Sequence, residues 1–328
     1  MEKSLQLKYQ SDRKVWDNCA ITYEDQIVSG HPDVVAYEKF EENFLDKVCL
    51  YLDKNYESSL KIIDVGCGSG RLHVRYGKYV KIPSIENVSG VDFSEKMLEI
   101  ARLKLKQEGI EGLSCPVLEF EQGSAFDLQP ETATVLPVAV NLINSLGVMQ
   151  GEKGAQELFK AMRRCVEHAG GIAIISCYQK AFIKQYALPQ YESTLNVCGQ
   201  PAWLKPDTFA SEKYILKPKY FKRANEDELS LEVEVYENNR LIIPSFLLYR
   251  DNKLTEQVIK SGKIKTYSDY ESNWYSFSQI EDWMKEHWNG LPMYHIPTQA
   301  IDPENAEAGQ LAILDINNIL KEFISKIL

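Results

Sequence analysis

Three glycines that follow a short β-branched run are the residues most informative about chemistry. Gly66, Gly68 and Gly70 come directly after Leu60–Val65, so the sequence predicts a strand that runs into a glycine turn and then a helix. Glycines in such a turn let the backbone approach a ligand without a Cβ in the way. Asp64, two residues ahead of the first glycine, adds a carboxylate at the end of the strand, which suits a cationic group better than a pyrophosphate.

The spacing of these glycines argues against a dinucleotide. It is GxGxG, whereas the dinucleotide fingerprint is GxGxxG, and the third glycine of that fingerprint would fall at Arg71. A dehydrogenase that uses NAD would also place an acid near Asp92, so this class stays an alternative that the glycine spacing weakens.

Strands and helices alternate along the segment that contains the turn. Amphipathic helical patterns are predicted at 34–54, 94–107 and 153–168. Strands are predicted at 60–65, 87–91, 116–120, 133–141 and 171–176. Strands separated by helices imply right-handed crossovers, so we expect an α/β fold with a doubly wound, mostly parallel, seven-stranded Rossmann-like sheet.

The pattern changes after Tyr178. Strand-like runs without helices between them predict an antiparallel β insertion at 214–221, 229–236, 241–250 and 258–267, with a hairpin turn at 237–240. The core pattern then returns with a helix at 276–288 and strands at 293–296 and 310–316. An apolar stripe of period near 3.6 from Ile316 to Ile327 predicts a C-terminal helix packed on the core.

These patterns divide the chain into four predicted parts. We expect an N-terminal helical segment over the ligand site, the Rossmann-like core, a substrate lid inserted after strand five, and a completion of the core with the C-terminal helix, at 1–59, 60–178, 179–270 and 271–328. In open α/β sheets ligands bind beyond the carboxyl ends of the strands, which is where an insertion after strand five begins.

Two motifs at the expected separation resemble those of the class I S-adenosylmethionine-dependent methyltransferases. Asp64-Val65-Gly66-Cys67-Gly68-Ser69-Gly70 is similar to the first motif of that family, and Gly90-Val91-Asp92-Phe93-Ser94 is similar to the second, in which the acid binds the ribose hydroxyls. The resemblance covers residues 60–178 and, more loosely, 270–316. Asn144-Ser145-Leu146 adds a short likeness to glycine and sarcosine N-methyltransferases. The resemblance implies S-adenosyl-L-methionine as cofactor, with S-adenosyl-L-homocysteine as product.

The resemblance also implies a set of site residues. The predicted cofactor-binding residues are Asp64, Gly66, Cys67, Gly68, Gly70, Arg71, Asp92, Phe93, Met97, Ser124, Ala125, Phe126 and Asn141. Where the family usually has an acid beside the adenine amine, this chain has Ser124, and the choice between Ser124 and Asp127 stays open. Arg71 is open between a contact to the methionine carboxylate and an ion pair. Tyr23 and Tyr178 are the predicted catalytic residues, and Cys67 and His73 are interpreted as structural.

Composition narrows the class of acceptor. The net charge is −10, from 37 basic and 47 acidic residues, which on average repels a phosphate backbone. No motif for methylation of nucleic-acid bases is present, so we expect no nucleic-acid partner. Methyl transfer to a nitrogen or oxygen of a small molecule is the expected activity. A protein or peptide methyltransferase and a catalytically silent cofactor-binding subunit remain as alternatives.

The remaining expectations concern location and assembly. The seven cysteines contain no CxxC pair and no spacing suited to zinc, so we expect reduced thiols and no metal. The charged N-terminus has no apolar signal region and no segment is long and apolar enough to cross a membrane. We therefore expect a cytoplasmic enzyme without a membrane partner, monomeric or homodimeric.

Overall fold

The computed structural model describes residues 32–182, 214–225, 228–237, 240–247 and 272–328, together with Arg13, Trp16, Asp17 and Ala20. The predicted catalytic Tyr23 and the predicted strand at 258–267 lie outside these residues. Contacts divide the chain into two compact units, Met1–Val35 with Lys180–Trp274 and Ala36–Gln179 with Tyr275–Leu328. The helix predicted within the segment 1–59 thus belongs, from Ala36 onward, to the same unit as the core strands. Among the described residues, none of the helices combines the length and apolar composition that a bilayer crossing requires.

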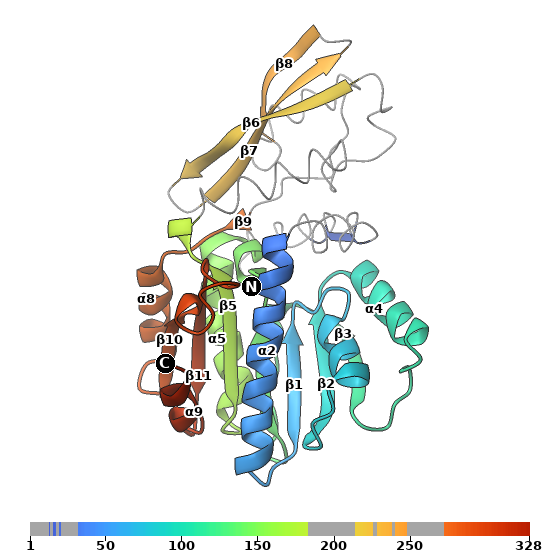
Figure 1. The fold of residues 1–328 in the computed structure, drawn as a ribbon, viewed down its shortest axis with the longest axis vertical. Helices are drawn as coiled ribbons and strands as arrows, with labels where there is room; N and C mark the ends of the chain where they lie inside the picture. Colours follow the sequence, from blue (N-terminus) through green and yellow to red (C-terminus); the bar gives the residue numbers. More distant parts are fainter. Residues whose placement is uncertain are drawn as a thin grey trace. The chain divides into compact units, whose positions relative to one another are not determined.

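A seven-stranded sheet forms the centre of the second unit (Figure 1), in the order β10-β11-β5-β4-β1-β2-β3. Its strands are β1 (Leu60–Val65), β2 (Ile85–Asp92), β3 (Val117–Gln122), β4 (Leu136–Asn141), β5 (Ile172–Tyr178), β10 (Met293–Pro297) and β11 (Gly309–Asp315). The strands from β3 to β5 are parallel, whereas β11 runs antiparallel to β5 and β10 antiparallel to β11. The predicted doubly wound, mostly parallel seven-stranded sheet is confirmed.

Helices cover both faces of this sheet. They are α2 (Pro32–Asn55), α3 (Arg71–Val74) continued by η2 (Arg75–Tyr79), α4 (Glu95–Gln107), α5 (Gly151–Glu167), α8 (Phe277–His287) and α9 (Lys321–Ile327). Alternate strand residues point to opposite faces, so Ile62 packs in one core cluster with residues of α2 and α9, while Ile63 packs in another with residues of α5 and α8. These two clusters hold the layers together through burial of apolar surface.

The C-terminal helix is shorter than the apolar stripe predicts. It begins at Lys321 rather than near Ile316. The carboxylate of Asp315 accepts hydrogen bonds from the backbone N–H groups of Ile319 and Leu320, at 2.8 and 2.7 Å, and Asn318 has a left-handed φ of 55°. A turn capped by Asp315 therefore replaces the first part of the predicted helix.

The other unit contains the antiparallel strands that the sequence predicts after strand five. They are β6 (Tyr214–Asn225), β7 (Glu228–Glu237) and β8 (Arg240–Leu247), joined by the short β9 (Ser272–Asn273), which pairs with β7. Glu237 pairs with Arg240 across the β7–β8 connection, as the predicted hairpin requires. The antiparallel insertion is confirmed. The strand β9 was not predicted, because two residues are too few to give a periodic signal in the sequence.

Candidate functional site

The glycine turn begins where the central strand β1 ends. Gly66, Gly68 and Gly70 have φ values of 77°, 50° and 79°, in the left-handed region that favours glycine. The N–H groups of Gly66 and Cys67 donate to the carbonyl oxygen of Val91, at 2.8 and 3.2 Å. These bonds tie the turn to the end of β2, which lies beside β1.

The last two glycines of the turn serve different purposes. A Cβ built on Gly68 would meet no atom of the described residues within 4 Å, so the backbone there faces a space that these residues leave open. A Cβ on Gly70 would lie 2.9 Å from both the Cβ of Ala101 and the Cζ of Phe120. Gly68 therefore leaves room for a ligand, whereas Gly70 allows the turn to pack closely on α4 and β3.

Asp92 connects the turn to the start of α4. Its buried carboxylate accepts a hydrogen bond from the Gly68 N–H through Oδ2 at 2.8 Å and one from the Ser94 N–H through Oδ1 at 2.9 Å. Ser94 caps α4 by accepting from the N–H of Met97 at 3.2 Å, and Met97 is buried beneath it. Phe93 is half-buried between these residues. The predicted second motif thus forms one continuous structure with the first.

Asp64 is a buried carboxylate at the end of β1, paired in register with Gly90 on β2 and Val140 on β4. Burial raises the pKa of its carboxyl to about 7, against the opposing effect of the Arg71 guanidinium and with a further increase from Asp92. A cation bound beside Asp64 would stabilise its ionised form.

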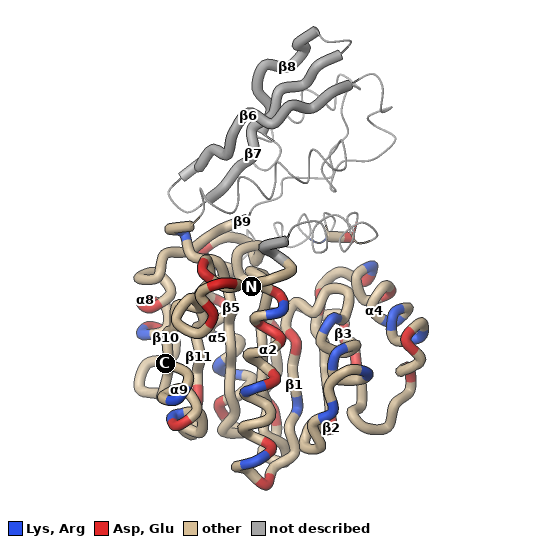
Figure 2. The backbone as a smooth tube through the Cα atoms, viewed as in Figure 1, with Lys and Arg blue, Asp and Glu red and all other residues tan. Residues whose placement is uncertain are grey.

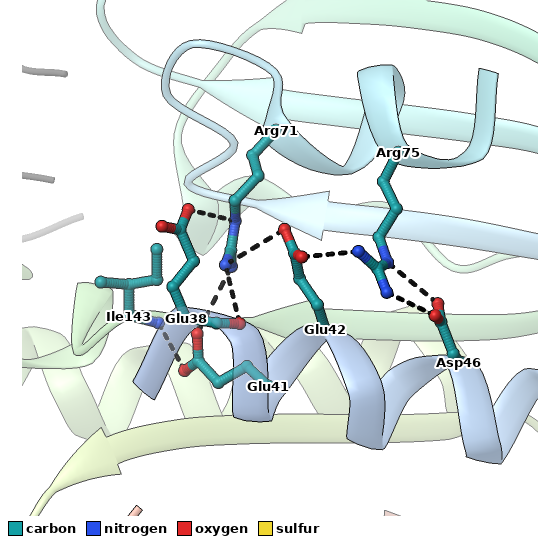
Figure 3. A network of polar contacts seen from close by, with 7 residues as sticks. All are labelled: Glu38, Glu41, Glu42, Asp46, Arg71, Arg75 and Ile143. Carbon is teal, nitrogen blue, oxygen red and sulfur yellow. Dashed lines mark hydrogen bonds and ion pairs between the residues drawn. The ribbon is translucent and has the colours of Figure 1, made fainter. Parts of the chain in front are cut away.

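Arg71 is engaged by three carboxylates of α2, as Figure 3 shows. Its Nε lies 3.2 Å from Glu38, its Nη2 lies 3.4 Å from Glu41 and its Nη1 lies 3.7 Å from Glu42. These acids raise the pKa of the guanidinium against the effect of its burial. Of the two roles considered for Arg71, a contact to the cofactor and an ion pair, the structure shows the ion pair. The paired groups are largely shielded from solvent.

The end of β4 lies against the first glycine. Asn141 is fully buried, and its Nδ2 donates to the carbonyl oxygen of Val65 at 2.7 Å. Its Oδ1 is buried without a hydrogen-bond partner among the described residues. A Cβ on Gly66 would lie 3.4 Å from the Cε of Met149 and 3.6 Å from the Cβ of Ser145, so the loop after β4 forms a wall beside Gly66.

Tyr178, the other predicted catalytic residue, ends β5 next to that loop. Its N–H donates to Oδ1 of Asn144 at 3.2 Å, and its half-buried ring lies 4.8 Å from the ring of Tyr37. The described residues thus bring Tyr178 to the same sheet edge as Asp64 and Asn141.

The loop after β3 carries the residues predicted for the adenine side. Ser124 is buried, and its Oγ accepts a hydrogen bond from the N–H of Phe126 at 3.2 Å, while Ala125 and Phe126 are half-buried. The N–H of Gly123 donates to the carbonyl oxygen of Asp92 at 3.0 Å. Asp127, the alternative acid, is exposed. Burial and proximity to the strand end of Asp92 favour Ser124.

Cys67 and His73 have the surroundings of structural residues. Burial, with help from Asp92 and Asp64, raises the pKa of the Cys67 thiol well above its usual range. Burial lowers the pKa of His73 to about 4, and its ring stacks on Phe120 at 4.0 Å while Nε2 bonds to the backbone oxygen of Glu119. Neither group is ionised near neutral pH.

Sequence reasoning missed three polar residues behind this edge. Glu41 is 1% exposed on α2, and the hydroxyl groups of Tyr37 and Ser176 lie 2.8 Å apart in the same buried region. One signal for Glu41 exists in the sequence, because an acid at this position falls on the apolar stripe of the helix beside Phe40 and Phe44.

Comparisons with known proteins identify the family. A family model described as a methyltransferase domain matches residues 56–220, just over half of the chain. Demethylmenaquinone methyltransferases of two serovars of Leptospira interrogans are 30% identical over 115 residues, which is 34% of this chain and 42% of each relative. The match thus spans less than half the length of these curated relatives.

A solved structure shows the same fold. A crystal structure of an S-adenosylmethionine-dependent methyltransferase from Clostridium acetobutylicum ATCC 824 has a TM-score of 0.50 and 16% identity, covering 90% of this chain and 97% of that one. The PH0226 protein from Pyrococcus horikoshii OT3 has a TM-score of 0.47 and 16% identity, covering 84% and 91%.

The chain belongs to the methyltransferase-domain family. The predicted resemblance to the methyltransferases is thereby confirmed, and the likeness to the Clostridium acetobutylicum structure confirms the predicted fold.

Proposed function

We propose that this chain transfers a methyl group from S-adenosylmethionine to a nitrogen or an oxygen of a small-molecule acceptor. The observation that carries the proposal is the joined structure of the Gly66–Gly68 turn and the Asp92 carboxylate at the carboxyl edge of the sheet. Family membership supports the transfer reaction, and the acidic sequence supports the acceptor class.

The described residues fit this cofactor in three respects. The space beside Gly68 admits a ligand against the backbone. Each oxygen of Asp92 accepts one backbone N–H, and a carboxylate held in this way at a strand end suits the hydroxyls of a ribose. The buried Oδ1 of Asn141 is an acceptor without a donor among the described residues, and a cofactor ammonium group would supply one.

From these features we propose roles for the predicted site residues. Asp64 and Asn141 bind the cationic amino-acid end. Asp92 binds the ribose, and Ser124 with the half-buried Phe93 and Phe126 contacts the adenine. Gly70 and Arg71 are proposed to support the site without contacting the cofactor, because Gly70 packs on α4 and Arg71 is paired with acids of α2.

The chain's part in the reaction is alignment and exclusion of water. When bound, the sulfonium cofactor supplies a methyl group that is already activated, and positioning of the two reactants contributes roughly 7–11 kcal/mol to lowering the barrier. Tyr178 orients the acceptor from the end of β5, where its backbone is fixed by Asn144. Tyr23 is proposed for the same task.

The insertion after β5 is the proposed substrate lid. It begins at the carboxyl end of a strand, where ligands bind in open α/β sheets. Its aromatic content supplies side chains for a pocket or for cation–π contact with an amine. Tyr275, which follows the insertion, is buried in the core cluster with α8 and is excluded from that task.

The mixed charges along the described helices support the same choice of acceptor. Figure 2 shows acidic and basic residues interspersed along the backbone of α2 and α4, whereas a nucleic-acid interface typically has a continuous basic stripe. From the sequence we also propose that the protein is cytoplasmic and is a monomer or a homodimer.

The proposed function is tested by incubating the chain with radiolabelled S-adenosylmethionine and three fractions of a cell extract: small metabolites, proteins and RNA. We expect label in the small-metabolite fraction, with a product heavier by one methylene in mass spectrometry. Asp92→Ala should abolish most of this labelling, because loss of hydrogen bonds to the cofactor weakens binding by about 1–3 kcal/mol.

Glu157→Ala is the matched control, since Glu157 is an acid on the exposed side of α5 that pairs only with Lys160 among its described ion pairs. Its labelling should equal that of the unchanged chain. Label confined to the protein or RNA fraction would contradict the small-molecule proposal. Cofactor binding without label in any fraction would favour the silent subunit.

A further inference from the structure

Glu41 is a buried carboxylate on the apolar face of α2. It is 1% exposed and lies among Tyr37, Phe40 and Phe44, which are also buried. An ionisable side chain in such a place is costly unless its oxygens are paired. The pairing of Glu41 therefore indicates what the residue does.

The Glu41 carboxylate joins two segments at the sheet edge. Its Oε1 accepts a hydrogen bond from the backbone N–H of Ile143 at 2.7 Å, and its Oε2 lies 3.4 Å from Nη2 of Arg71 (Figure 3). Arg71 follows the glycine turn after β1 and Ile143 follows β4, so Glu41 connects the carboxyl ends of two neighbouring strands.

The backbone that Glu41 holds is strained. Ile143 has a φ of 50° and Asn144 a φ of 53°, both in the left-handed region. A β-branched residue rarely adopts that conformation, and it persists only where surrounding contacts enforce it. The Ile143 N–H bond to a buried carboxylate is such a contact, because a hydrogen bond to an ionised acceptor is stronger than one between neutral groups.

The strained turn sets the wall beside the first glycine. Met149 and Ser145 lie on the same loop and approach the position that a Gly66 Cβ would take, at 3.4 and 3.6 Å. Asn144 accepts the hydrogen bond from the Tyr178 backbone. A shift at Ile143 would thus move the loop that borders Gly66.

We propose that Glu41 is a positioning residue that fixes the loop after β4 and so shapes the pocket for the amino-acid end of the cofactor. This inference rests on the proposed function. Glu41 is proposed to contact neither reactant and to act through Ile143 and Arg71.

The test compares two ligands by calorimetry, in a buffer more alkaline than the pKa of Glu41, which burial raises to about 7. S-adenosylhomocysteine has the amino-acid part, and 5′-methylthioadenosine keeps the adenosine and the sulfur but lacks that part. Glu41→Gln should lower the affinity for S-adenosylhomocysteine by about tenfold and leave the affinity for 5′-methylthioadenosine within about twofold of its value in the unchanged chain. A general loss of stability would not separate the two ligands.

Glu42→Gln is the matched control, because Glu42 also pairs with Arg71, at 3.7 Å, whereas the Ile143 N–H donates to Glu41. Both affinities should stay within about twofold of the unchanged chain. Thermal unfolding of each variant checks that it is folded. If Glu41→Gln fails to fold, Glu41→Asp retains the negative charge while shortening the reach to Ile143, and the same selective loss is expected.

If a folded Glu41 variant lost affinity equally for both ligands, or for neither, this would overturn the proposal while leaving the proposed function intact. An unchanged chain that binds neither ligand would overturn the proposed function, and the role of Glu41 with it. The two failures are therefore distinguishable in one set of measurements.

Discussion

Asp64 and Glu41 are two buried carboxylates under the electrostatic influence of Arg71, and burial raises the pKa of each to about 7. Arg71 opposes the shift in both cases but does not cancel it. The free protein thus holds acids at this edge that are partly protonated at neutral pH. A cationic ligand beside Asp64 would favour its ionised form and lower its pKa, because opposite charges at short range stabilise each other.

This linkage predicts that cofactor affinity rises with pH. Below pH 7 the Asp64 carboxyl of the free protein is mainly protonated, and ionising it costs part of the binding free energy. At one pH unit below that pKa only about a tenth of the carboxyl is ionised, so we expect affinity roughly tenfold below its alkaline plateau. Calorimetric titration with S-adenosylhomocysteine across this range measures the effect. Asp64→Asn should bind weakly at every pH, without the rise.

The stability of Asp64→Asn provides the control. A carboxyl whose pKa is higher in the folded state than in the unfolded state makes the fold less stable as pH rises from about 4 to about 7. Removal of the charge should therefore leave the free energy of unfolding at alkaline pH equal or higher. A pH rise in affinity that persists in Asp64→Asn would assign the titration to another group, and Glu41→Gln would then identify Glu41.

At the scale of elements, Gly70 joins the helix α3 to the helix α4 and the strand β3. Its φ of 79° is left-handed, and a Cβ there would lie 2.9 Å from Ala101 and from Phe120. Both constraints act on the same residue. Gly109, after α4, shares the left-handed backbone with a φ of 68°, but a Cβ there would meet no atom of the described part of the chain within 4 Å.

These two glycines form a matched pair for a stability prediction. Gly109→Ala should lower the free energy of unfolding by about 1–2 kcal/mol, the usual cost of a left-handed conformation for an L-residue. Gly70→Ala should lower the free energy of unfolding by about a further 1–3 kcal/mol, because overpacking adds to the cost of the left-handed backbone. Urea unfolding measures both values. Equal losses would show that the neighbours of Gly70 in α4 and β3 move aside without a measurable cost in stability.

The same elements show what the sequence could predict. Strand β1 was predicted at its observed bounds because its β-branched run is limited by glycines. The stripe from Ile316 predicted too long a helix, since the bonds from Asp315 to the next turn leave no periodic signal. The left-handed φ of Ile143 and the three acids around Arg71 depend on contacts between distant segments, which no local pattern contains.

At the scale of the whole molecule, the chain leaves its Rossmann-like unit after Gln179 and returns to it at Tyr275. These two residues pair in an isolated parallel β-bridge, so the ends of the intervening segment lie side by side. Segments whose ends meet can be removed with little effect on the remaining backbone, because a short linker closes the gap.

Replacing residues 180–274 with a linker of about three residues, each of which spans at most about 3.3–3.6 Å, is expected to leave a folded unit that binds cofactor. All described residues proposed to bind the cofactor lie within residues 36–179, so S-adenosylhomocysteine affinity should stay within about threefold, a change smaller than 1 kcal/mol. Methyl transfer to the acceptor found in the labelling experiment should be lost, because the proposed lid is absent. Circular dichroism and a single thermal transition establish that the unit is folded. Transfer at the original rate by the shortened chain would place the acceptor on the Rossmann-like unit alone and would remove the insertion from the reaction.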